Sequence, residues 1–226
     1  MAEEGQGDAV PLDSPAKGRA ARVKPGCMQG SMVHAFYDHS ITALWLAWLI
    51  YWCVASIGAK RTRRHESTTW RLMHLVPLAI GIGLLLSPHV ANGWLAVRFL
   101  PRSLIWFWTG FVLVASGLGF SVLARIWLGG NWSGMVTLKQ DHELIRSALY
   151  RWVRHPIYTG LLLALLGSVI AAGEWRGLAG LAVVTASFLR KIAVEEQFMA
   201  EQFGIAYSSY RTEVPALIPL PSRRID

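Results

Sequence analysis

The chain has 226 residues, of which 53% are hydrophobic and 16% are charged, and it contains 11 tryptophans. This composition excludes an ordinary soluble enzyme and indicates a membrane protein with interfacial aromatic residues. The net charge of +8 is scattered over segments that flank apolar stretches, so it predicts contact with membrane lipids and no nucleic-acid partner. The length leaves room for one integral domain and one tail, so a catalytic site has to be built on membrane helices.

Residues 1–30 are rich in glycine, alanine, proline and charged residues and contain no apolar run, which predicts a disordered tail without the apolar core of a secretory signal. Residues 31–226 then form the membrane domain. Cys27 and Cys53 are the only cysteines, and they lie in the tail and in a predicted span. This number excludes a disulfide framework and a cysteine-rich metal site.

Five apolar stretches follow the tail, and we predict that each forms a membrane-spanning helix. The fold class is therefore all-α, as a polytopic membrane protein with about five transmembrane helices. An outside N-terminus places most of the 22 lysines and arginines on inner segments, which predicts a cytoplasmic C-terminus. The second stretch is short and carries His74 and Pro77. The five stretches are 40–58, 72–88, 104–124, 157–172 and 176–194.

The last two stretches predict a helical hairpin. Pro156 suits the first position of a helix, and it disfavours helical geometry at His155, which becomes the cap. The run from Gly173 to Gly177 then interrupts the apolar residues with flexible and polar ones. Because the chain returns to the side it left, we expect Arg154 and His155 to lie near Glu195 and Glu196 in space.

Glu196 is a carboxylate on an apolar helix stripe. At 100° per residue, it shares a face with Ile192, Met199 and Phe203, while Glu195 lies at the edge of that face. A buried carboxylate requires a partner, and one at membrane depth marks a functional site by default. A salt bridge to Arg154 or Arg190 is the alternative interpretation.

Two segments, LYRWVRHPIYTG and EEQFMAEQFGIAYSSYRTEVPALIP, resemble the C-terminal signature of the isoprenylcysteine carboxyl methyltransferase and phospholipid methyltransferase superfamily. The resemblance covers roughly 128–219. It implies that residues 126–226 bind S-adenosylmethionine at the cytoplasmic membrane surface, and that residues 31–125 serve the substrate. The family commonly has Gly-Pro where this chain has Ser147-Ala148, so the turn before Tyr150 differs.

The resemblance places His155, Tyr158 and the glutamate pair on the cofactor side. A cofactor with a carboxylate, an amine, a ribose and a sulfonium also requires free helix N–H groups and aromatic walls, which the same segment supplies. The candidate cofactor-binding residues are Tyr150, His155, Pro156, Tyr158, Gly160, Glu195, Glu196, Tyr207 and Tyr210. The candidate catalytic residues are Arg211, Glu196 and Arg154, with Arg211 or Arg154 neutralising an acceptor carboxylate unless it pairs with Glu196 or lipid phosphate.

The remaining polar residues carry weaker signals. We expect segment 126–153 to lie along the membrane surface, with Asn131-Trp132-Ser133 as a wall or a packed interfacial loop. Isolated histidines such as His74 are explained by interfacial or core packing. The tryptophans are explained as interfacial anchors and packing residues; the set considered is Trp45, Trp48, Trp52, Trp94, Trp106 and Trp108.

No histidine or cysteine spacing suits zinc, and no glycine-rich phosphate loop is present, so we expect no metal and no soluble nucleotide fold. The acceptor is expected to be lipophilic and to enter from the bilayer: a prenylcysteine carboxylate, a phospholipid or a small hydrophobic compound. Two alternatives remain open. One is an NADPH-dependent reductase, because sterol reductases share a similar C-terminal architecture, and the other is a non-enzymatic membrane scaffold.

Overall fold

The computed structural model describes residues 25–57, 68–86, 93–129 and 144–219, with side chains from residue 39 onwards except at 68–71 and 86. Residues Tyr37–Asp226 form one compact unit, and the first part of the chain, Met1–Phe36, forms another. The described elements are α1 (Pro25–Ile57), α2 (Thr68–Leu86), η1 (Gly93–Ala96), α3 (Leu104–Leu128), η3 (Ala148–Arg151), α4 (Pro156–Ala172), α5 (Trp175–Phe203) and α6 (Ile205–Glu213). The predicted all-α class is confirmed for the described part of the chain.

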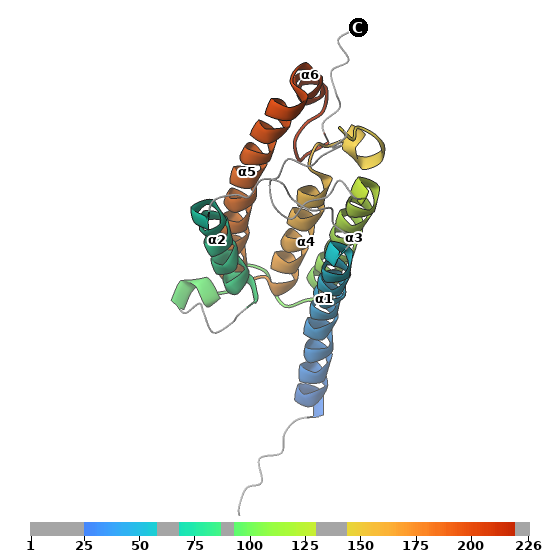
Figure 1. The fold of residues 1–226 in the computed structure, drawn as a ribbon. Coiled ribbons are helices and arrows are strands. Elements are labelled where there is room, and N and C mark those ends of the chain that lie inside the picture. The colour runs from blue at the N-terminus through green and yellow to red at the C-terminus, as the bar shows by residue number, and fades with distance from the viewer. Residues whose placement is uncertain (1–24, 58–67, 87–92, 130–143, 220–226) are drawn as a thin grey trace, which may run out of the picture. The chain divides into compact units, whose positions relative to one another are not determined.

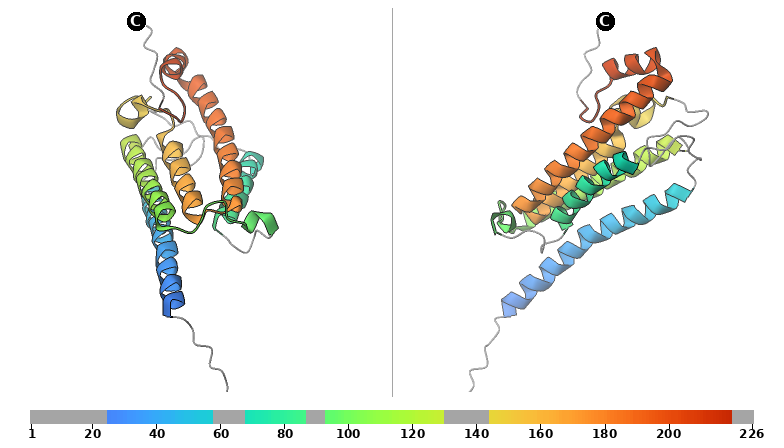
Figure 2. Two further views of the ribbon diagram at one scale, coloured as in Figure 1. Left: turned by 180° about the vertical axis from the view of Figure 1, so that it is seen from behind. Right: turned by 60° about the vertical axis from the view of Figure 1, so that its left-hand side comes forward.

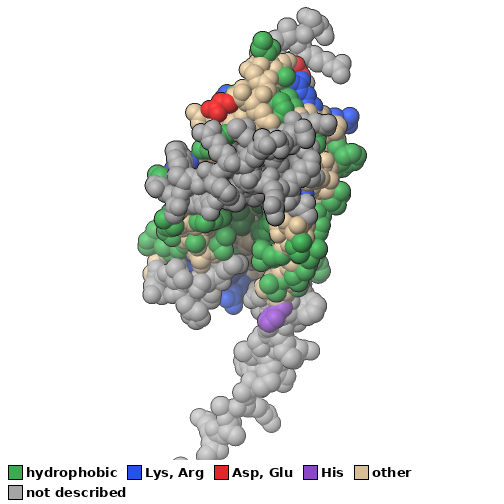
Figure 3. Space-filling model, in the orientation of Figure 1, with side chains coloured by type: hydrophobic (Ala, Val, Ile, Leu, Met, Phe, Trp, Pro, Cys, Tyr) green, Lys and Arg blue, Asp and Glu red, His purple; other side chains and the backbone are tan. Residues whose placement is uncertain are grey.

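The helices suit a membrane by length and composition. Three stretches are long and apolar enough to cross one: His39–Ile57, Leu104–Leu128 and Trp175–Phe203. Two shorter apolar helical stretches, Leu72–Leu85 and Pro156–Ala172, coincide with the other two predicted spans. Among the described side chains visible in Figure 3, most of those along the helices are hydrophobic, and charged ones occur at the α6 end and near the opposite end. These features agree with a multi-pass integral membrane protein, while the count of five spans stays a prediction.

The boundaries of α4 are those that the sequence predicts. His155 is the N-cap with φ −123°, and Pro156 opens the helix. Gly173 ends it at φ 64°, a left-handed conformation that glycine adopts without steric cost. The chain then doubles back into α5 at Trp175.

Two pairs of helices pack closely, and glycines make both contacts possible. In the α3–α4 pair, a Cβ atom added at Gly117 would lie 2.5 Å from the Gly160 carbonyl oxygen. In the α2–α5 pair, one added at Gly180 would lie 2.6 Å from the Gly81 carbonyl oxygen. Small residues of this kind let helix backbones approach without an intervening side chain. Figures 1 and 2 show the resulting order of α3, α4, α5 and α2 across this unit.

The ends of α2 and α5 away from α6 are tied together by polar contacts. The buried Arg176 guanidinium donates hydrogen bonds to the carbonyl oxygens of Leu84 (3.0 Å) and Leu85 (3.2 Å), which α2 leaves unpaired at its C-terminus. Arg176 also pairs with Glu174, whose other oxygen lies 3.7 Å from Arg98. This cluster holds the C-terminal end of α2 against the start of α5.

Candidate functional site

Glu196 lies at the centre of a charged cluster. Its Oε1 atom accepts hydrogen bonds from Arg154 Nη2 at 2.6 Å and Nε at 3.0 Å, and it lies 3.2 Å from His155 Nε2. Its Oε2 atom lies 3.4 Å from Nε of the exposed Arg211. The expectation that the histidine and the acidic pair meet is therefore confirmed. The salt bridge that the sequence left as an alternative forms with Arg154, whereas Arg190 donates instead to the Met73 carbonyl oxygen.

The segment after α6 binds across the start of α4, an arrangement that the sequence did not predict. The backbone N–H groups of Arg154 and His155 donate to the carbonyl oxygens of Pro215 (2.9 Å) and Ala216 (3.0 Å). The Thr159 hydroxyl donates to the Leu217 carbonyl oxygen at 2.8 Å. These bonds fix the backbone beside the charged cluster, so the C-terminal segment is part of the site's framework.

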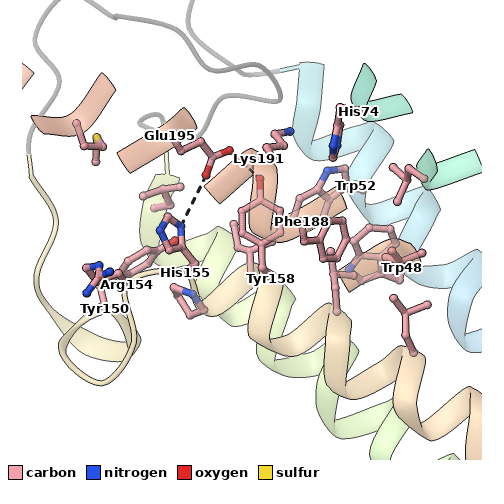
Figure 4. A pocket seen from close by; sticks show the side chains of 18 of the residues that line it. Trp48, Trp52, His74, Tyr150, Arg154, His155, Tyr158, Phe188, Lys191 and Glu195 are labelled. Carbon is pink, nitrogen blue, oxygen red and sulfur yellow. Dashed lines mark hydrogen bonds and ion pairs between the residues drawn. The ribbon is translucent and has the colours of Figure 1, made fainter. Parts of the chain in front are cut away.

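Glu195 points towards a different set of groups from Glu196. The Tyr158 hydroxyl donates to its Oε1 atom at 2.7 Å, and its Oε2 atom lies 3.7 Å from His155 Nδ1 (Figure 4). His155 therefore stands between the two glutamates, with one ring nitrogen towards each. Lys191, which the sequence places one turn before Glu195, lies nearby on the same helix (Figure 4).

A cavity of about 630 Å³ opens between the α3–α4 and α2–α5 pairs. Its polar end has Arg154, His155, Tyr158 and Glu195, together with tyrosines 150, 207 and 210. Its other end is apolar and lies between α1, α2, α4 and α5. The lining residues there include Trp45, Trp48, Leu78, Ile82, Leu85, Leu161, Leu165, Val184 and Phe188. One cavity thus joins a hydrogen-bonding end to a lipophilic end.

Three tryptophans of α1, Trp45, Trp48 and Trp52, line this cavity. The prediction that they are interfacial anchors and packing residues therefore describes only part of their surroundings. Trp45 Nε1 donates to the Ser168 hydroxyl at 3.1 Å, and Trp48 Nε1 donates to the Ser121 hydroxyl at 2.8 Å. Trp48 stacks on Trp52 at a centroid distance of 4.7 Å. No sequence signal distinguished these indoles, because their partners lie on helices more than 70 residues away. Trp94 and Trp108, by contrast, are exposed as expected.

Three buried tyrosines surround the polar end. The Tyr210 hydroxyl donates to the Tyr150 carbonyl oxygen, and the Tyr150 hydroxyl lies 3.4 Å from the Ala124 carbonyl oxygen. Burial raises the pKa of Tyr207 and of Tyr210 to about 12, and it also raises that of Tyr150. All three phenols stay protonated at neutral pH and can donate hydrogen bonds. Before Tyr150, Ala148 adopts φ 52°, so the turn at the Ser147-Ala148 departure is left-handed.

Three residues predicted for the cofactor or catalysis lie beside the cavity instead of on its wall. Gly160 faces the Gly117 carbonyl oxygen in the α3–α4 contact. Glu196 and Arg211 lie behind Arg154 and His155, and neither is among the residues that line the cavity. Pro156 is buried and reaches the cavity at the start of α4. Residues 130–143, which include Asn131, Trp132 and Ser133, lie outside the described residues.

Within the described side chains, no group of three or more His, Cys, Asp or Glu residues could hold a metal ion. The polar groups at the polar end of the cavity are a carboxylate, an imidazole, a guanidinium and phenols. Such a set suits a zwitterionic or hydroxyl-rich organic guest through hydrogen bonds and opposite charges.

Comparison with known proteins finds similarity in the part of the chain that carries the site. Residues 108–201 match the isoprenylcysteine carboxyl methyltransferase family. A protein-S-isoprenylcysteine O-methyltransferase of Schizosaccharomyces pombe is 33% identical over 119 residues, which are 48% of this chain and 50% of that protein. A steroid 5-alpha-reductase of Solanum lycopersicum is 24% identical over 130 residues, which are 58% of this chain and 51% of that protein. The chain thus spans about half the length of these relatives.

A solved structure of a eukaryotic intramembrane Ras methyltransferase, an isoprenylcysteine carboxyl methyltransferase, covers 69% of this chain with 54% of its own. The two chains are 21% identical, with a TM-score of 0.45. The segment that matches the family, residues 108–201, includes α4 and most of α5. These two helices and the N-cap of α4 carry His155, Tyr158 and both glutamates. Residues 108–201 of this chain are thus similar to the isoprenylcysteine carboxyl methyltransferase family.

Proposed function

We propose that the chain is an integral membrane methyltransferase that uses S-adenosylmethionine to methylate a lipophilic acceptor. The observation that carries the proposal is that one continuous cavity joins a polar, tyrosine-rich end to an apolar end between the helices. A polar cofactor and a lipophilic acceptor can occupy opposite ends of such a cavity and meet between them. The names of the relatives support the reaction class, since S. pombe's protein is called an O-methyltransferase.

The residues at the polar end fit S-adenosylmethionine. Glu195 can accept hydrogen bonds from an amine or ribose hydroxyls, and Tyr158 holds its carboxylate in place. Arg154 and His155, together with the start of α4, offer a site for a carboxylate. The rings of Tyr158, Tyr150 and Tyr207 offer faces that favour a sulfonium cation. When bound, the cofactor supplies an electrophilic methyl group.

The chain's own contribution is then to hold the acceptor and to exclude water, which together can account for most of the acceleration in a displacement reaction. Tyr158 and Phe188 form one wall at the junction of the two ends, with ring centroids 5.0 Å apart. Arg154 lines the cavity and Arg211 does not, so Arg154 is better placed than Arg211 to neutralise an acidic acceptor. In this proposal Glu196 positions Arg154 and His155, and Arg211 reinforces Glu196.

The same proposal places the polar end at the cytoplasmic surface. With five spans and an outside N-terminus, α4 begins and α5 ends on the inner side, where basic residues gather. The acceptor would enter from the bilayer, towards the apolar end of the cavity. Its identity as a prenylcysteine carboxylate, a phospholipid or another small hydrophobic compound is left to experiment.

A second candidate, an NADPH-dependent membrane reductase, is favoured by the similarity to the steroid 5-alpha-reductase of Solanum lycopersicum. Calorimetric titration of the purified protein with S-adenosylmethionine and with NADPH separates the two. We expect binding of the former alone. Binding of NADPH alone would favour the reductase, and binding of neither would favour a scaffold without a cofactor.

The acceptor is tested by incubating the purified protein with a membrane lipid extract and methyl-labelled S-adenosylmethionine. Mass spectrometry should then find label in a lipophilic product. A Glu195→Gln variant that still folds serves as the matched control and should form less of that product. Label confined to water-soluble products would contradict the proposal.

A further inference from the structure

The apolar end of the cavity is bounded by one residue from each of four helices. The lining residues that lie farthest from the polar end are Trp45 of α1, Leu85 of α2, Ser168 of α4 and Val184 of α5. The described residues of these helices that follow in the same direction do not line the cavity. We refer to these four residues as the floor of the cavity.

Trp45 joins α1 to α4 across the floor. Its Nε1 atom donates to the Ser168 hydroxyl at 3.1 Å, and that hydroxyl donates to the Ala164 carbonyl oxygen at 3.0 Å. The indole also packs against two apolar clusters, one formed by α3 with α4 and the other by α4 with α5. The position of the ring is therefore set by both a hydrogen bond and packing.

The helices are in contact immediately beyond the floor. A Cβ atom added at Gly177 of α5 would lie 3.3 Å from a methyl group of Val169, so α4 and α5 touch one residue past Ser168. At the same end, Arg176 donates to the last carbonyl oxygens of α2. A chain that enters from the polar end therefore meets packed helices behind Trp45.

The walls between the polar end and the floor are apolar. His74 on α2 and Lys191 on α5 are polar lining residues, and they lie where this part of the cavity begins. The histidine is bonded to the Ser187 hydroxyl at 2.9 Å. From these two residues to the floor, the lining side chains of α2 and α5 are all hydrophobic. A polar atom on a guest would lose its hydrogen bonds with water there, so this part of the cavity suits a hydrocarbon chain.

The helical rise gives the depth of the apolar part. Tyr158, which lies at the junction of the two ends, precedes Ser168 on α4 by ten residues. This separation corresponds to about 15 Å along the helix. An extended chain of single bonds advances about 1.2 Å per bond, so about 12 bonds span the distance.

We propose that Trp45 determines how long the acceptor's hydrocarbon chain can be. The inference rests on the proposed function, because it concerns the acceptor end of the same cavity. A chain that ends before Trp45 lies wholly between the apolar walls. A longer chain has to displace the indole from Ser168 or leave the cavity, and either costs binding free energy.

Tethered chains of two lengths test this limit. A single thiol is placed at the start of the apolar part by Lys191→Cys, with Cys27 and Cys53 replaced by serine. The purified full chain in lipid nanodiscs is incubated with equimolar octyl and hexadecyl methanethiosulfonates, and added thiol lets the adducts exchange to equilibrium. Intact-mass spectrometry measures the ratio of the two adducts. Leu189→Cys, at an exposed position on the same helix, gives the ratio that the lipid alone sets.

Relative to Leu189→Cys, we expect Lys191→Cys to favour the octyl adduct at least about tenfold, because the longer chain overpacks the floor. Adding Trp45→Ala should remove most of this preference. Trp48→Ala is the matched control, because Trp48 also donates one hydrogen bond to a serine, Ser121. That serine lies against Gly160 near the start of α4, so Trp48 is on the side wall and its loss should leave the preference intact.

If the Trp45→Ala protein fails to fold, Trp45→Phe removes the N–H group and part of the ring and should still reduce the preference. The proposal is overturned by an equal adduct ratio at Lys191→Cys and Leu189→Cys. It is also overturned if a folded Trp45 variant keeps the full preference, or if the Trp45 and Trp48 variants lose it equally. Because the adducts form without a cofactor, the result is independent of whether the chain binds S-adenosylmethionine or transfers a methyl group.

Discussion

Glu196 Oε1 lies 2.6 Å from Arg154 Nη2, and both side chains are less than a tenth exposed. The carboxylate of the neighbouring residue, Glu195, instead lines the cavity. Two adjacent glutamates on one helix therefore have different surroundings. Glu196 pairs with the buried Arg154 guanidinium, and Glu195 faces the cavity.

Changing Glu196 to glutamine should destabilise the protein. The substitution keeps the side chain's size but leaves the buried Arg154 guanidinium without its carboxylate. Breaking a buried ion pair from one side costs roughly 3 kcal/mol, and we expect a correspondingly lower midpoint of unfolding in detergent.

Changing Glu195 to glutamine is the matched comparison. An amide oxygen can still accept the Tyr158 hydrogen bond, so the unfolding midpoint should change little while affinity for S-adenosylmethionine falls. Calorimetric titration measures the affinity. A stable Glu196→Gln variant, or a Glu195→Gln variant with unchanged affinity, would contradict this division of roles.

Changing Gly117 to alanine should separate α3 from α4. The added Cβ would lie 2.5 Å from the Gly160 carbonyl oxygen and 2.6 Å from the Ala164 backbone nitrogen, so the helices must shift. Overpacking of this kind costs about 1 to 3 kcal/mol, and thermal unfolding should show the loss.

Gly119, on the same helix, provides the control. Nothing lies within 4 Å of a Cβ built there, so Gly119→Ala should leave the unfolding temperature unchanged or raise it slightly. Equal destabilisation by both variants would show that α3 itself, and not its contact with α4, is sensitive to alanine.

Alkaline pH should destabilise the α6 region. Burial, and secondarily the Glu196 carboxylate, raise the pKa of Tyr207 from 10.0 to about 12. The folded state therefore holds the phenol's proton more tightly than the unfolded state does. The stabilisation is complete below pH 10 and is lost as the pH rises towards 12. Unfolding midpoints measured across this range should fall, and less steeply in Tyr207→Phe. Tyrosinate absorbance from Tyr207 near pH 10 in the folded protein would contradict this.

The two termini should lie on opposite sides of the membrane. A chain with five spans crosses the membrane an odd number of times, so a reporter on the N-terminus should be active outside and one on the C-terminus inside. Fusions at both ends test this in cells. Same-side termini would refute the five-span count and require α2 or α4 to stay within one leaflet.

Local sequence patterns were sufficient to predict where the helices of the site begin and end. Pro156 sets the start of α4 because its ring excludes helical geometry for the residue before it, and Gly173 ends the helix through its left-handed φ. The predicted hairpin and the 3.6-residue helical period then suffice to place Glu196 near His155. Both the hairpin and the period can be predicted from residues that are close together in the sequence. The left-handed turn at Ala148 was not evident, because alanine gives no local signal for a positive φ.

The amino-acid sequence by itself determined the helical membrane class, the boundaries of α4 and the meeting of His155 with the acidic pair, because these follow from composition, proline and glycine geometry and helical periodicity. Only the tertiary structure decided that Glu195 and not Glu196 faces the cavity, and that Trp48 and His74 line the walls of this cavity. It also decided that the segment after α6 holds the start of α4. These contacts join residues far apart in the chain, so they depend on how the helices pack and not on local sequence patterns. The close approach of α2 to α5 at Gly81 and Gly180 is one such packing contact.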